Sequence, residues 1–99
     1  MKPTWEFAGY RYISAPFLWD DSLKGHIVVL RRQAMTGACC TLSVHSSEAQ
    51  AGGTWRFRES VMPWVGIHTL SPDIDRGTWV RLEVEYSPQH PEEPDVTVL

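Results

Sequence analysis

The sequence predicts an all-β protein: a small antiparallel sandwich or barrel of six to seven strands, with at most one short helix. Short segments rich in β-branched and aromatic residues follow one another, and several alternate apolar and polar residues with period two. Seven Gly and seven Pro interrupt the 99-residue chain too often for long helices. We expect a single β-rich domain over residues 1–87, followed by a proline-rich acidic tail over 88–99.

The clearest predicted strand covers residues 78–86. Successive side chains of a strand point to opposite faces of its sheet, so residues two apart share a face. One face is apolar and is expected to point to the core: Val80, Leu82, Val84 and Tyr86. The opposite face carries an indole and charged groups: Trp79, Arg81, Glu83 and Glu85.

Residues 40–46 and 54–59 predict a hairpin with a long connection. The first strand is expected to turn three residues inward (Cys40, Leu42 and Val44) and three outward (Thr41, Ser43 and His45). In the second strand, Trp55 and Phe57 are expected to face the core together. The outward residues of the second strand are then Thr54, Arg56 and Arg58.

Three further segments are expected to form extended strands. The apolar run within 26–35 suits a central strand covered on both sides. Residues 5–12 change phase between Phe7 and Tyr10, which a bulge at Ala8–Gly9 would reconcile. Pro63 forbids a regular central strand over 61–70, so that segment is expected at an edge or with a bend.

The remaining segments are less regular. Residues 15–25 are expected to form a short helical turn, capped near Asp20 and ended by Gly25. The prolines of the 88–99 tail favour an extended conformation. Its last residues, 96–99, have the composition of a final strand that returns to the domain.

Charge and cysteine content limit the compartment and the partners. Nine Lys and Arg against twelve Asp and Glu give a net charge of −3, which argues against general nucleic-acid binding. The two cysteines are adjacent, so a disulfide between them would be strained and a reducing cytoplasm is expected. The N-terminus lacks a secretory pattern, and the longest apolar run, 27–30, is too short for a membrane span.

No pattern for catalysis, a metal or a cofactor emerges, and none is expected. Cys39 and His45 are separated by about 20 Å along an extended strand, too far for a nucleophile and its base. The four histidines and two cysteines form no close pair of the kind that structural zinc sites use. Phosphate-binding and acyl-transfer motifs are absent from the sequence.

The five tryptophans suggest a binding surface, because so many indoles are difficult to bury in one small core. If strand 78–86 pairs with strand 54–58, one outer sheet face gathers a candidate partner-binding set: Trp79, Arg81, Arg56, Arg58, Thr54 and Glu83. Two structural alternatives compete with this interpretation. The arginines can pair with the glutamates across the strands, or Trp79 can lie beneath residues 17–19 as part of a second core.

The leading functional hypothesis is a small non-enzymatic binding protein of the adaptor, inhibitor or immunity type. It would dock on a protein partner, or on a second copy, through this outer face. An alternative is a small barrel, as a monomer or a dimer, that holds an apolar or aromatic molecule in a cavity lined by Trp55, Phe57, Trp64, Tyr10 and Tyr12. A third hypothesis is carbohydrate binding through exposed Trp19 and Trp79.

Overall fold

A computed structural model describes residues 1–9, 11–31, 40–46, 55–61, 66–86 and 93–99; of residues 31, 40, 55–61, 66 and 86 it describes the backbone alone. The described part of the chain is all-β and contains no helix, so it also has none that is long and apolar enough to cross a membrane. It forms nine strands: β1 (Trp5–Phe7), β2 (Arg11–Ser14), β3 (Phe17–Trp19), β4 (Ile27–Arg31), β5 (Cys40–Ser46), β6 (Trp55–Val61), β7 (Gly66–Leu70), β8 (Thr78–Tyr86) and β9 (Asp95–Val98).

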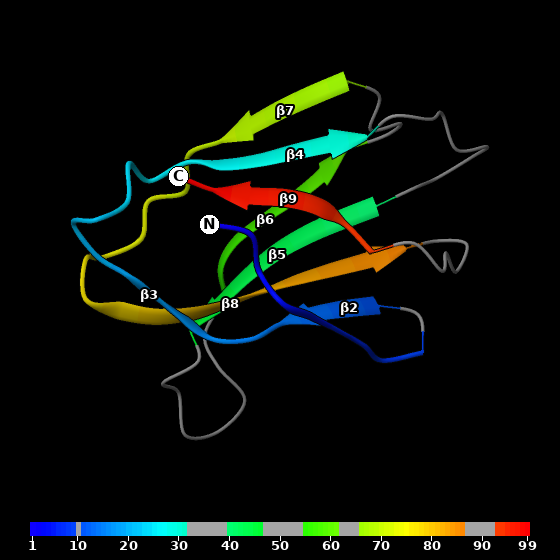
Figure 1. Ribbon diagram of the computed structural model, residues 1–99, viewed down its shortest axis with the longest axis horizontal. Helices are drawn as coiled ribbons and strands as arrows, with labels where there is room; N and C mark the ends of the chain where they lie inside the picture. Colours follow the sequence, from blue (N-terminus) through cyan, green and yellow to red (C-terminus); the bar gives the residue numbers. More distant parts are fainter. Residues whose placement is uncertain (10, 32–39, 47–54, 62–65, 87–92) are drawn as a thin grey trace.

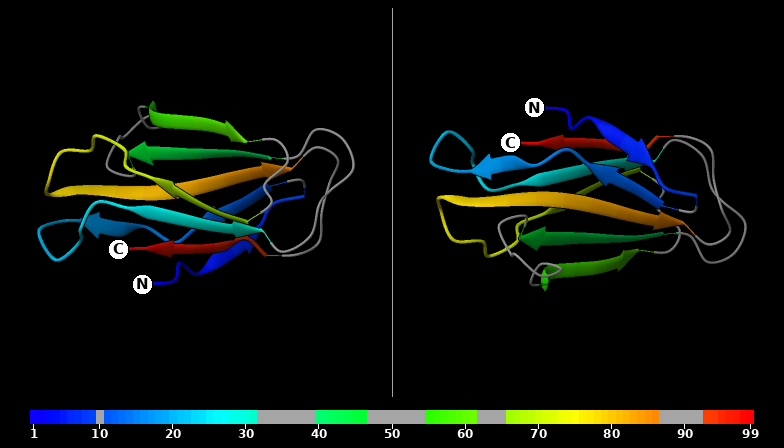
Figure 2. Two further views of the ribbon diagram at one scale, coloured as in Figure 1. Left: turned by 90° about the horizontal axis from the view of Figure 1, so that it is seen from above. Right: turned by 90° about the horizontal axis from the view of Figure 1, so that it is seen from below.

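The strands form two antiparallel sheets, which confirms the predicted fold class. Sheet A has six strands in the order β1-β2-β8-β5-β6, and β3 pairs with a further part of β8. Sheet B has three strands in the order β7-β4-β9. Figure 1 shows sheet B in front of the larger sheet, and the two views of Figure 2 show both sheets from above and below.

The hydrophobic core lies between the two sheets. Sheet A contributes the predicted inward residues of β5 and β8: Leu42, Val44, Val80, Leu82 and Val84. Sheet B contributes four apolar side chains: Ile27, Val29, Val96 and Val98. Removing a side chain of this size from water stabilises the fold by about 1.5–3 kcal/mol. The alternation predicted for β8 and β5 is confirmed at these positions.

Strand β8 is the central element of sheet A. One side of β8 pairs with β5, while the other side pairs first with β3 and then with β2. Between β3 and β2 the chain passes through Ala15 and Pro16. At this junction the Leu82 amide donates to the hydroxyl Oγ of Ser14 at 2.7 Å, so a side chain takes the place of a missing backbone acceptor.

The bulge predicted at Ala8–Gly9 is wrong. Residues 5–14 instead form a hairpin in which Phe7 pairs with Tyr12. The Ala8 amide donates to the carbonyl of Arg11 at 2.8 Å, and Gly9 has a φ of 74°, a conformation that glycine adopts without steric cost. The change of phase in the sequence therefore marks a chain reversal.

The helical turn predicted for residues 15–25 is also wrong. Residues 17–19 form β3, because their backbone groups pair with β8, and a turn follows. The Asp20 carboxylate accepts hydrogen bonds from the backbone amide and hydroxyl of Ser22. Gly25, at a φ of 87°, ends this turn, and Arg76 holds it by donating to the carbonyl of Leu23 at 3.0 Å.

Sheet B confirms three predictions and corrects a fourth. Strand β4 is central and β7 lies at the edge, as predicted. However, β4 is covered on one face only: Ile27 and Val29 are buried, whereas Val28 and Leu30 are half-buried. The expected final strand is present as β9, which pairs with β4.

The predicted β5–β6 hairpin is confirmed, with one irregularity. Phe57 pairs with Val44, but Trp55 pairs with His45, so the register shifts between these two positions. The prediction that Trp55 and Phe57 face the core together assumes a regular pairing of β6 with β5. The register shift interrupts that regular pairing.

Candidate functional site

The outer face of sheet A, which points away from sheet B, carries an exposed indole. Trp79 is 44% exposed and pairs with Leu18 of β3, which is half-buried. The alternative that buried Trp79 beneath residues 17–19 is wrong, because β3 lies beside β8 in the same sheet. Trp19 belongs to the core with 1% exposure, so the carbohydrate hypothesis loses one of its two exposed rings.

Next to this indole lies a cluster of charged and polar groups centred on Glu83. The Glu83 carboxylate is nearly buried, with 7% of the residue exposed. Its Oε1 accepts from Nη1 of Arg11 at 3.0 Å, and its Oε2 lies 3.0 Å from Nε2 of His45. The Arg81 Nη1 atom is 3.7 Å from Oε2. We call these four residues the Glu83 cluster.

Strand register explains why the four side chains meet. Arg81 pairs with His45 on β5, and Arg11 on β2 pairs with Glu85. Residues directly opposite in an antiparallel pair share a face, so Arg11, His45 and Arg81 surround Glu83 on that face. Three strands that are distant in sequence therefore supply one ion-pair network.

Histidine 45 is 5% exposed, and its surroundings determine its charge. Burial lowers its pKa below 6.5, and the positive charge of Arg81 lowers it further; the carboxylate of Glu83 opposes both effects. The imidazole is therefore neutral near pH 7. The cluster then holds two guanidinium groups and one carboxylate, a local charge of +1.

The structure brings together half of the predicted site. Trp79, Arg81 and Glu83 lie on one face of β8, but β8 does not pair with β6 as the predicted set assumed. Strand β5 lies between them, so Arg56 and Arg58 are two strand spacings from β8, about 10 Å. Thr54 lies outside the described residues.

Sequence reasoning missed Arg11 and His45 as partners of Glu83. The outward position of His45 followed from the alternation in residues 40–46. Its contact with Glu83, however, depends on β5 and β8 being neighbours, and the contact of Arg11 depends on β2 and β8 being neighbours. No local pattern signals either contact.

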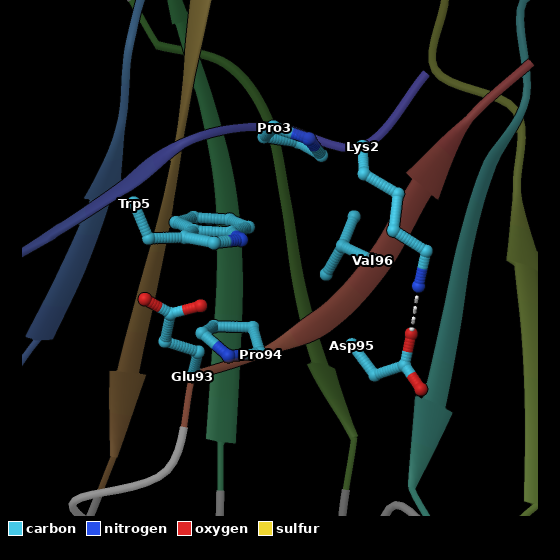
Figure 3. A pocket seen from close by; sticks show the side chains of 7 residues that line it. All are labelled: Lys2, Pro3, Trp5, Glu93, Pro94, Asp95 and Val96. Carbon is cyan, nitrogen blue, oxygen red and sulfur yellow. Dashed lines mark hydrogen bonds and ion pairs between the residues drawn. The ribbon is translucent and has the colours of Figure 1, made fainter.

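A shallow groove lies at the opposite side of the molecule, where the N-terminal segment passes from sheet B to sheet A. Its volume is about 260 Å³. Figure 3 shows its lining, which comes from both ends of the chain: Lys2, Pro3, Trp5, Glu93, Pro94, Asp95 and Val96. Sequence analysis did not assign it, because only the fold brings these two segments together.

Of the five residues proposed to line an aromatic cavity, the structure describes the side chain of Tyr12, while Trp55 and Phe57 are described by their backbone alone. Tyr12 is buried in the core, where its ring lies 4.8 Å from that of Phe7. Tyr10 and Trp64 lie outside the described residues, and the cavity remains a hypothesis for them. Among the described His, Cys, Asp and Glu, no three are placed to hold a metal ion.

Comparisons with family models, with curated proteins and with solved structures found no match to this chain. The functional proposals therefore rest on the geometry of the outer face of sheet A and of the groove.

Proposed function

We propose that this chain is a small non-enzymatic binding protein of the adaptor, inhibitor or immunity type. It docks on a protein partner through the outer face of sheet A, with Trp79 as the central contact. The observation that carries the proposal is the 44% exposure of Trp79, an indole fixed on the central strand of a rigid sheet. Tryptophan and arginine are the residues most enriched among dominant contacts in protein interfaces.

The surroundings of Trp79 favour a rigid contact. Leu18 lies directly across from Trp79 and extends the apolar surface around the indole. Arg81 is two residues along the same face, and its guanidinium lies near Glu83. A side chain that is already ordered loses less conformational entropy on binding, which improves affinity.

The charge of the Glu83 cluster beside Trp79 indicates the chemistry of the partner. The Glu83 cluster carries a net charge of +1 when His45 is neutral. We therefore propose a partner surface with an apolar pocket for the indole and a carboxylate beside it for Arg81. Such a partner is acidic at the contact, although the whole chain carries a charge of −3.

Site-specific crosslinking tests this proposal. A photoreactive tryptophan analogue, which keeps the indole, is placed at position 79 in cells of the source organism, and crosslinked proteins are identified by mass spectrometry. Position 67 serves as the matched control, since Ile67 is 71% exposed on β7 of the other sheet. We expect one crosslinked protein at position 79 that is absent at position 67.

Binding to that protein is then measured with purified variants. We expect Trp79→Ala to weaken the affinity at least about tenfold, as loss of a dominant interface contact does, and Ile67→Ala to leave it unchanged. Thermal unfolding of both variants should match the wild type within a few degrees. Equal affinity of the wild type and Trp79→Ala, or identical crosslinks at both positions, would contradict the proposal.

A further inference from the structure

The groove beside β9 combines an aromatic ring with an exposed carboxylate. Trp5 is half-buried: it packs on the core and also lines the groove. Figure 3 shows the Glu93 carboxylate close to the Trp5 ring. Glu93 is exposed, and it makes no hydrogen bond or ion pair among the residues that the structure describes.

The other end of the groove is closed by a pair of opposite charges. Lys2 donates from Nζ to Oδ1 of Asp95 at 2.8 Å. Beyond this pair, the Met1 ammonium donates to the carbonyl of Val98 at 2.9 Å, and the Val98 amide donates to the carbonyl of Met1 at 2.8 Å. The N-terminal segment is therefore fixed against β9, and the wall of the groove is held in place.

The groove ligand should be a cation. The electron-rich face of an indole attracts cations, and a nearby carboxylate adds a charge-assisted hydrogen bond. An anion would be repelled by Glu93, and an apolar group would remove water from that carboxylate without replacing its hydrogen bonds. The net charge of −3 favours the approach of positively charged partners.

We propose that this groove binds an arginine side chain of a protein partner. The planar guanidinium stacks on the Trp5 indole and donates to the Glu93 carboxylate, a geometry that a lysine ammonium does not provide. The volume of about 260 Å³ suits one side chain, since pockets for drug-sized molecules measure roughly 300–1,000 Å³. This site is separate from the Trp79 surface and goes beyond the proposed function.

Titration with a small probe tests the proposal. N-acetyl-arginine amide is added to ¹⁵N-labelled protein, and its neutral isostere N-acetyl-citrulline amide is added to a second sample at equal ionic strength. We expect saturable shifts of the Trp5 indole resonance and of the residue 93–96 amides with the arginine probe only. Shifts of equal size with both probes would overturn the proposal.

Charge variants locate the site. Glu93→Gln should weaken binding of the arginine probe about fivefold or more, because it removes the carboxylate and leaves the groove in place. Glu85→Gln is the matched control, since it removes an exposed carboxylate on β8 and changes the net charge equally. Unchanged binding by Glu93→Gln, or equal weakening by both variants, would overturn the proposal.

The proposal for the Trp79 surface and the proposal for the groove can be tested independently of each other. Trp79→Ala should leave the arginine-probe titration unchanged, because Trp79 lies on β8 and none of the groove residues does. Conversely, Glu93→Gln should leave the affinity for a protein captured at position 79 within about twofold, since charges outside a contact surface change affinity little.

Discussion

Glu83 is the central residue of the ion-pair network on the outer face of sheet A. Its carboxylate is nearly buried, and it lies between the guanidinium groups of Arg11 and Arg81. A buried carboxylate with several cationic neighbours contributes little net stability compared with an apolar residue of equal size. Removing the carboxylate alone, however, takes away the acceptor that Arg11 and Arg81 share.

We therefore expect Glu83→Gln to lower the free energy of unfolding by about 2 kcal/mol, because Arg11 and Arg81 lose their shared partner in a partly buried setting. Glu85→Gln, two residues further along β8 and exposed, should change it by less than about 0.5 kcal/mol. Urea denaturation of both variants measures the difference. Equal stabilities would show that the cluster does not need its carboxylate.

His45 gives the fold a dependence on pH. The free histidine pKa is 6.5, and burial together with Arg81 lowers the pKa in the folded protein. Above pH 6.5 the imidazole is neutral in both states, so it adds no pH dependence. Below that pH the unfolded chain binds a proton that the folded protein resists, and the free energy of unfolding falls.

A His45→Gln variant should remove this contribution. Between about pH 7.5 and pH 5.5 we expect the wild type to lose more stability than the variant, because only the wild type has an imidazole that must stay neutral when folded. Denaturant titrations at several pH values measure the two slopes. Identical slopes would mean that another group causes the loss.

Strand β8 of sheet A has strand partners on both of its sides. Strand β5 lies along one side of β8, and β3 and β2 share the other side. Strand β7, by contrast, is paired with β4 alone. Amide protons exchange with solvent through local opening, and strands paired on both sides open least.

Hydrogen exchange should therefore be slower for the paired amides of β8 than for the amides of β7 that point away from β4, because the latter lack a strand partner. Exchange rates measured residue by residue by NMR at neutral pH give the order. Similar protection of both strands would contradict the pairing described here.

Prediction from sequence succeeded where apolar and polar residues alternate along a strand. In β8 and β5 the alternate apolar side chains Leu42, Val44, Val80, Leu82 and Val84 enter the core, so counting by twos identified both faces. It failed at residues 15–25, where Asp20 and Gly25 resemble a helix cap and a helix end but bound a turn after β3. Three residues of β3 are too few for a periodic signal, and pairing with β8 decides their conformation.

Across the whole molecule, the partition into two sheets was not predictable. The sequence indicated a hairpin of residues 40–46 with 54–59, and this local pair exists. The neighbours of β8, however, come from residues 11–14, 17–19 and 40–46, and no local signal relates them. The Glu83 cluster and the groove depend on such distant pairings, so both sites escaped sequence analysis, whereas the exposure of Trp79 did not.

Sheet B joins segments that the ribosome produces at very different times. Strand β4 is translated early, yet it is completed by β7 and finally by β9 near the end of the described chain. Until then Ile27 and Val29 lack their cross-strand neighbours Val98 and Val96. The nascent polypeptide thus cannot assemble this sandwich in the order of its synthesis, so its apolar strands stay accessible to chaperones until translation has passed residue 98.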